Sequence, residues 1–139
     1  MTLNQEQRAI LAALADVLIP AGEGFPSASE AGVANEGLDY VLNCRPELTA
    51  GLTQLLATAR GRAPAEFLAE IQKNDPATFA MLTDLVAGAY FLKPVVREKL
   101  GYGGQTALPI DPRADYLDDA LLQSVIDRGP IYRPTPPKP

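Results

Sequence analysis

Histidine and tryptophan are absent from the 139-residue sequence, and Cys44 is its single cysteine. The lack of imidazole excludes histidine-based catalytic triads, imidazole general bases and zinc sites with histidine ligands. One cysteine allows neither an internal disulfide nor a cysteine metal cluster. We therefore expect no catalytic, cofactor-binding or metal-binding residues in this chain.

Long apolar runs are also missing, since no stretch approaches the roughly 18 to 20 residues needed to cross a bilayer. The opening residues, MTLNQEQRAI, contain no basic region, apolar region or twin arginine typical of an export signal. These observations argue against direct membrane insertion. As it stands, the sequence predicts a cytoplasmic protein. A trimmed leader, or a signal carried by a partner, would instead predict a periplasmic one.

Positive charge is scarce at the start of the chain. Through Cys44 the sequence has one basic residue, Arg8, against six acidic residues, and beyond that point the two signs balance. The net charge of the whole chain is −5. No face is expected to carry the basic stripe that binds phosphate backbones, which argues against nucleic acid as a partner.

What the sequence does contain is typical of a helical globular protein, with 47% hydrophobic and 21% charged residues. Apolar residues recur at helical spacing in stretches bounded by capping residues, proline or glycine. The expected helices span residues 2–20, 27–43, 45–61, 63–75, 75–92 and 117–129, and a brief turn is expected at 93–101. The sequence thus predicts an all-α fold, an irregular bundle of five to seven helices in one domain (1–129). An extended, proline-rich C-terminal arm (130–139) follows it.

Local signals set the limits of these helices. Thr2 or Asn4 can cap the first one, and Asp75 followed by Pro76 is typical of a helix start. The stretch 75–92 is the most apolar of all, so we expect it at the centre of the bundle.

The break after the first helix is the most unusual local feature. Pro20 ends that helix, and a new one is expected to begin at Ser27, with Glu30 completing a capping box, or at Ser29. Asp16 lies late in the first helix, where its negative charge opposes the helix dipole. Either it has a partner elsewhere, such as the loop amides after Pro20 or an arginine, or its side chain is solvated.

Two groups of residues suggest ligand sites but have simpler explanations. The stretch GYGGQ (101–105) has the glycines of a phosphate-binding loop, yet it follows a helix and lacks the Lys-Ser pair of such loops. A helix stop explains its glycines equally well. Asp111, Asp115, Asp118 and Asp119 could be oxygen ligands of a metal, but their spacing matches no EF-hand, and acidic residues before a helix favour its dipole.

Aromatic and arginine residues cluster in the sequence near Pro94, the glycine-rich stretch and the tail. Either they pack in the core, or they form an interface, in which aromatic residues and arginine are typically enriched. A pre-extended tail would lose little entropy on docking. The candidate partner-binding residues are Tyr90, Phe91, Arg97, Tyr102, Arg128, Ile131, Tyr132 and Arg133.

Three stretches resemble one known family. LAALADVLIPAGEGFPSASEAGV (11–33) is similar to the N-terminal signature of the gluconate 2-dehydrogenase subunit 3 family. FAMLTDLVAGAYFLKPVVREKLGYGGQ (79–105) resembles that family's central helix, turn and Gly-Tyr-x-Gly, and VIDRGPIYRP (125–134) is in keeping with its ending. The residues that carry the resemblance are Asp16, Pro20, Pro26, Ser27, Glu30, Gly32, Gly101 and Gly104.

The resemblance implies a non-catalytic small subunit. Such a chain binds a large flavoprotein dehydrogenase of the glucose-methanol-choline (GMC) type and assists its maturation. The partner carries FAD, oxidises a sugar, sugar acid or other alcohol, and often passes electrons to a cytochrome subunit. This chain lacks the twin-arginine leader that the family often supplies. The resemblance places no cofactor in the small chain itself.

Two other hypotheses stay open at the level of sequence. One is a stand-alone small enzyme that uses tyrosine and carboxylate groups, with Arg97 or Arg128 holding an anionic substrate. The other is an assembly chaperone that leaves before the mature complex works.

Overall fold

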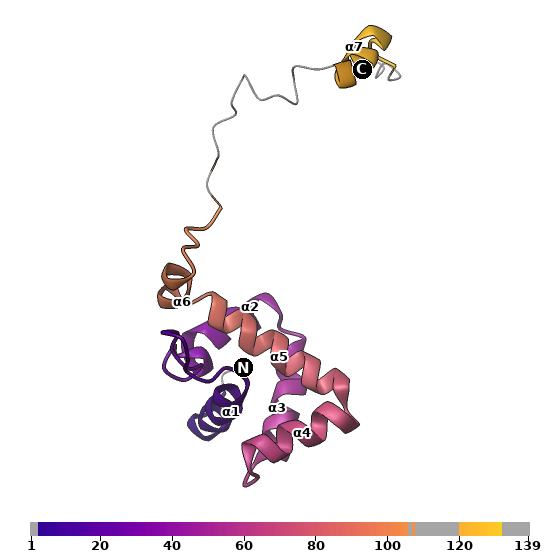
Figure 1. Cartoon of the computed structure of the whole chain (residues 1–139). Helices are drawn as coiled ribbons and strands as arrows, with labels where there is room; N and C mark the ends of the chain where they lie inside the picture. The colour runs from indigo at the N-terminus through magenta and orange to yellow at the C-terminus, as the bar shows by residue number, and fades with distance from the viewer. Residues whose placement is uncertain (1–2, 106, 108–119, 132–139) are drawn as a thin grey trace, which may run out of the picture. The chain divides into compact units, whose positions relative to one another are not determined.

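The computed structural model describes residues 3–105, 107 and 120–131, and within them the fold is all-α, as predicted. These residues contain no strand beyond an isolated bridge between Gly22 and Phe25. The elements are α1 (Gln5–Leu18), the π-helical turn η1 (Val33–Gly37), α2 (Leu38–Cys44), α3 (Leu48–Ala59), α4 (Pro64–Asn74), α5 (Pro76–Phe91), α6 (Pro94–Lys99) and α7 (Ala120–Arg128) (Figure 1).

The chain divides into two units, with the boundary between Gly104 and Gln105. The sequence places the boundary after residue 129, because α7 has the apolar spacing of a bundle helix. The predicted arm at 130–139 lies almost wholly outside the described residues. Each unit is described below by itself.

Helix α5 is the centre of the first unit, as predicted. It packs against α2, α3, α4, α6 and η1 (Figure 1). Apolar residues cover most of its circumference, which is typical of a helix surrounded by others. Its buried side chains are Leu82, Leu85, Val86, Ala89 and Tyr90.

The predicted helix starts at Asn4 and Asp75 are confirmed. Asn4 rather than Thr2 caps α1, and its side chain and that of Gln7 exchange hydrogen bonds with each other's backbone amides at 2.8 and 2.9 Å. The Asp75 carboxylate caps α5 by accepting a hydrogen bond from the Thr78 amide at 3.1 Å. These side chains satisfy backbone donors that a helix start leaves free.

The prediction of one continuous helix from Ser27 to residue 43 is wrong. The capping box forms, since the Ser27 amide donates to Glu30 at 2.8 Å and the Glu30 amide donates to the Ser27 hydroxyl at 3.3 Å. However, the turn that it starts ends at Gly32, whose φ of +72° is left-handed. The Val33 amide then bonds the Ala28 carbonyl at 3.0 Å, which closes a Schellman motif.

A kink follows in η1, where Asn35 has φ −109° and ψ −120°. Regular helix resumes only in α2. At this kink the Arg8 guanidinium donates hydrogen bonds to the carbonyl oxygens of Ala34 at 2.7 Å and Asn35 at 3.3 Å. Arg8 also pairs with Asp39 at 2.7 Å. The one basic residue of the first 44 therefore ties α1 to both η1 and α2.

Candidate partner-binding surface

Asp16, near the C-terminal end of α1, fixes the loop between α1 and η1, residues 19–32. Its carboxylate accepts hydrogen bonds from the Ser29 amide at 2.7 Å and the Ser29 hydroxyl at 2.6 Å. Partial burial acts to raise the pKa of Asp16, but these bonds, with a further one from Ser27, lower it below its usual value. Asp16 thus has a partner among the loop amides, one of the alternatives left open by the sequence.

Tyr90 fixes the same loop from α5. Its hydroxyl donates to the Pro26 carbonyl at 2.7 Å, and only 4% of the residue is exposed. Burial, and the nearby charge of Glu30, raise the pKa of the Tyr90 hydroxyl, so it stays a neutral donor. Tyr90 was predicted among the partner-binding residues. The structure corrects this, because a side chain buried in the core offers no contact area.

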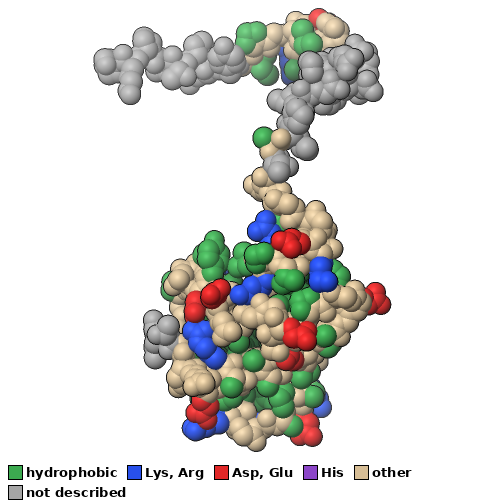
Figure 2. All heavy atoms as spheres, turned by 90° about the vertical axis from the view of Figure 1, so that its left-hand side faces the viewer, with side chains coloured by type: hydrophobic (Ala, Val, Ile, Leu, Met, Phe, Trp, Pro, Cys, Tyr) green, Lys and Arg blue, Asp and Glu red, His purple; other side chains and the backbone are tan. Residues whose placement is uncertain are grey.

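Exposed apolar side chains gather instead where α5 ends and α6 begins. Five exposed apolar side chains lie between residues 91 and 102, around the six residues of α6, which span only about 9 Å. Figure 2 looks onto the side that carries α6, with hydrophobic side chains lying between single charged groups. We name this surface the α5–α6 patch; its members are between 41% and 59% exposed and are Tyr40, Phe91, Leu92, Val95, Leu100 and Tyr102.

A groove of about 250 Å³ joins Tyr40 of α2 to the start of α6. Its walls include Leu92 and Pro94, and Glu36 and Lys93 bring one charge of each sign. The Lys93 stem lies close to Gly37, where an added Cβ would be 3.1 Å from Lys93 Cε. The patch therefore contains a concave site bordered by charges as well as a convex apolar surface.

Arg97 lies beside Tyr102, a member of the patch. The guanidinium lies over the Tyr102 ring, 5.4 Å from its centroid, a cation–π arrangement. Gly101 has φ +68° and ends α6 with a second Schellman motif, in which the Tyr102 amide bonds the Arg97 carbonyl at 2.9 Å. Gly101, the first glycine of GYGGQ, thus acts as a helix stop. At Gly104 a Cβ would lie 3.1 Å from the Arg97 guanidinium.

Of the predicted interface residues in the first unit, Phe91 and Tyr102 are exposed, and Arg97 contacts Tyr102. Arg128 and Ile131 belong to the second unit, and Tyr132 and Arg133 lie outside the described residues. Sequence analysis missed Tyr40, Leu92, Val95 and Leu100. For Leu92, Val95 and Leu100 the signal was their place around Pro94, beside a helix of only six residues that cannot bury them all. Tyr40, in α2, gave no such signal.

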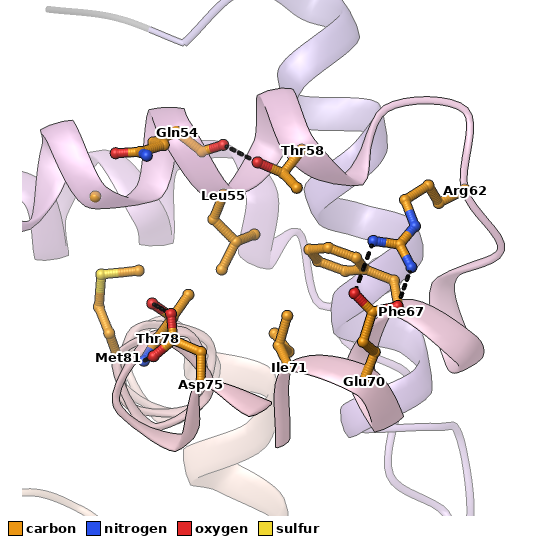
Figure 3. A pocket seen from close by; sticks show the side chains of 11 residues that line it. Gln54, Leu55, Thr58, Arg62, Phe67, Glu70, Ile71, Asp75, Thr78 and Met81 are labelled. Atoms are coloured by element: carbon orange, nitrogen blue, oxygen red, sulfur yellow. Dashed lines mark hydrogen bonds and ion pairs between the residues drawn. The ribbon is translucent and has the colours of Figure 1, made fainter. Parts of the chain in front are cut away.

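A separate cavity lies between α3, α4 and α5, with a volume of about 360 Å³ (Figure 3). Leu55, Phe67 and Ile71 form its apolar wall. Arg62 pairs with Glu70 at its edge and lies over the Phe67 ring, 4.8 Å from the centroid.

The carboxylates of this cavity are already engaged. The hydrogen bond from Arg62 lowers the pKa of Glu70, and hydrogen bonds from Thr78 lower that of Asp75. General bases work best with a pKa near the operating pH, and these shifts move both groups away from it. The two carboxylates that line this cavity therefore belong to the Arg62–Glu70 ion pair and to the Asp75 cap of α5.

Two further features are absent from the described residues. They contain no cluster of three or more acidic or cysteine side chains that could hold a metal. The aspartates 111, 115, 118 and 119 lie outside them. No helix among them has the length and apolar character needed to cross a bilayer.

In comparisons with known proteins, no family model, curated protein or solved structure matches this chain.

Proposed function

We propose that this chain is a non-catalytic small subunit that binds and stabilises a large FAD-dependent dehydrogenase of the GMC type. The partner holds the flavin and oxidises a sugar, sugar acid or other alcohol, and a cytochrome subunit can complete the complex. The resemblance of residues 11–33 and 79–105 to the gluconate 2-dehydrogenase subunit 3 family motivates the choice of partner. The structural observation that supports binding is the α5–α6 patch.

The patch has the composition of a protein interface. Aromatic residues with few torsions, such as Tyr40 and Phe91, provide large contact areas at low entropic cost. A grouped set of exposed apolar side chains at one corner is typical of an interaction site rather than of ordinary surface. Phe91 lies in α5, Val95 in α6 and Tyr40 in α2, while Leu92 and Leu100 cap the ends of α5 and α6. Because these five residues lie on or at the ends of helices, little ordering of them is needed on binding.

The residues beneath the patch serve to present it. Tyr90 is adjacent to Phe91, and the two rings meet edge to face with centroids 5.6 Å apart. The buried ring and its bond to Pro26 hold the C-terminal end of α5, from which Phe91 and Leu92 project. In this proposal the loop signature 19–32 acts indirectly, by fixing the helix that carries the contact residues.

Co-purification from the native host tests the proposal. The tagged chain is expected to bring down a large protein with flavin absorption, at one small chain per flavin. Isolation of the chain with no flavoprotein would contradict the proposal. Flavoprotein present only in an immature, inactive complex would favour the assembly chaperone instead. Turnover of an alcohol by the purified chain alone would favour the stand-alone enzyme.

A further inference from the structure

Helix α7 in the second unit is amphipathic, with an exposed apolar face. Leu122 is 36% exposed, Val125 49% and Ile126 65%. At 100° per residue these three positions fall within one arc of about 100°. Ile131, three residues after the end of the helix, is 73% exposed.

The opposite face of α7 is polar and internally satisfied. The Gln123 amide donates to the Asp127 carboxylate at 2.7 Å, one helical turn away. Ser124 and Arg128 share this side of the helix and are also exposed. The helix therefore has a polar face suited to water and a second face whose apolar side chains are also exposed to water.

Nine residues are too few for a helix to be stable in water by its own hydrogen bonds, because nucleation is costly. Most such helices owe their stability to an apolar face buried against another surface. Short amphipathic helices with anchors at this spacing typically bind in apolar grooves of larger proteins.

The charged residues in and before α7 indicate which kind of groove this helix would bind. Asp118 and Asp119 immediately precede α7 in the sequence, and Asp111 and Asp115 lie just before them. From 111 to 128 the sequence has five aspartates and two arginines. A complementary groove would have an apolar floor and a basic rim, with basic groups facing the start of the helix. Helices that lie on membranes usually have a polar face rich in lysine and arginine, which this one lacks.

We propose that α7 is a second contact element, which binds an apolar, basic-rimmed groove on the large flavoprotein through Leu122, Val125 and Ile126. This inference rests on the proposed function for the identity of the partner. Residues 105–119 separate α7 from the first unit and can span at most about 50 Å. Within that reach, engagement of the patch raises the local concentration of α7 at its groove, so the two contacts reinforce each other.

The test uses the full chain and the flavoprotein that co-purifies with it. The large subunit is released, and its affinity is measured for immobilised wild type, Ile126→Asp and Ser124→Asp. Both substitutions introduce the same residue inside the same helix, so their cost to helix formation is matched. Ile126→Asp is expected to weaken binding by at least tenfold, whereas Ser124→Asp, on the polar face, is expected to leave affinity within about twofold of wild type.

A second pair of measurements tests whether the acidic residues before α7 contribute to binding. Replacement of Asp118 and Asp119 by asparagine is expected to reduce affinity by about threefold, and added salt should weaken wild type more than this variant. Equal affinity of Ile126→Asp and wild type would overturn the proposal. So would a dimer of the isolated chain that Ile126→Asp dissolves, because a second copy would then cover α7. If wild type captures no flavoprotein, the proposed function itself fails, and the two failures are thereby distinguished.

Discussion

Asp16 and Ser29 are joined by two hydrogen bonds, from the Ser29 amide at 2.7 Å and its hydroxyl at 2.6 Å, across 13 positions of sequence. The bonds fix the loop 19–32 on the last turn of α1. They also explain why a carboxylate is found at a helix end whose dipole disfavours it. The charge is held by donors from outside the helix.

Asp16→Asn is expected to destabilise the protein by about 1 to 2 kcal/mol at neutral pH, because two charge-assisted bonds become weaker or are lost. The pKa of Asp16 is lowered in the folded state, so the stability it contributes is present above its unfolded pKa of about 3.9. That contribution disappears as the pH falls through the folded pKa. Urea denaturation at several pH values should show the difference between wild type and variant shrinking below about pH 4. A constant difference would contradict this account.

Tyr90→Phe is expected to cost about 1 kcal/mol, since the Pro26 carbonyl loses its hydrogen bond while the packing of the ring is kept. Tyr40→Phe is the matched control, because that ring is 59% exposed and its change should be within about 0.5 kcal/mol. Thermal unfolding of both variants gives the comparison. Equal effects would mean that the Tyr90 hydroxyl contributes nothing to holding the loop.

Gly37→Ala should destabilise the contact between η1 and α5. An added Cβ would be 3.0 Å from the Ala89 carbonyl oxygen and 3.3 Å from its Cβ, so the backbone of α5 would have to give by a few tenths of an ångström. The expected cost is about 1 to 3 kcal/mol. Gly88→Ala is the control inside α5, where the nearest atom is Val41 Cγ2 at 3.7 Å. It should be neutral or stabilise by up to about 1 kcal/mol, because alanine favours helix. Denaturation midpoints in the reverse order would refute the packing argument.

Leu92→Asp tests the α5–α6 patch without disturbing the core. Leu92 is 41% exposed and lines the groove with Tyr40, so a charge there should weaken the flavoprotein complex at least tenfold. Val17→Asp is the control, because Val17 is 45% exposed on α1, outside the patch. Titration of each variant with the flavoprotein subunit measures the effect. Similar losses for both would argue against the patch as the contact.

The sequence predicts those parts of the fold that depend on neighbouring residues. The caps at Asn4 and Asp75 and the glycine stop at Gly101 act within four or five positions, and all are present. The kink at Asn35 could not be predicted in this way. It is supported by Arg8, which lies 27 positions before Asn35 in the sequence. The Arg8 side chain reaches the carbonyl oxygens of Ala34 and Asn35 only in the folded protein.

The sequence predicts the candidate surface only in part, because the burial of its residues depends on contacts with distant parts of the chain. Phe91 is exposed and Tyr90 is buried, although the two are adjacent in the sequence. Because α5 is apolar around most of its circumference, periodicity does not indicate which of its sides remains open. That depends on where η1, α2 and α6 pack. The bond from Tyr90 to Pro26 spans 64 positions and leaves no local signal.

Oxidative footprinting of aromatic side chains, with and without the flavoprotein, tests the central claim most directly. Hydroxyl radicals should modify Tyr40, Phe91 and Tyr102 in the free chain, because each ring is more than half exposed. Binding is predicted to protect all three, while labelling of Met81, beside the separate cavity, stays the same. Unchanged labelling of the three aromatic rings in a stable complex would contradict the claim that this chain acts by binding its partner through the α5–α6 patch.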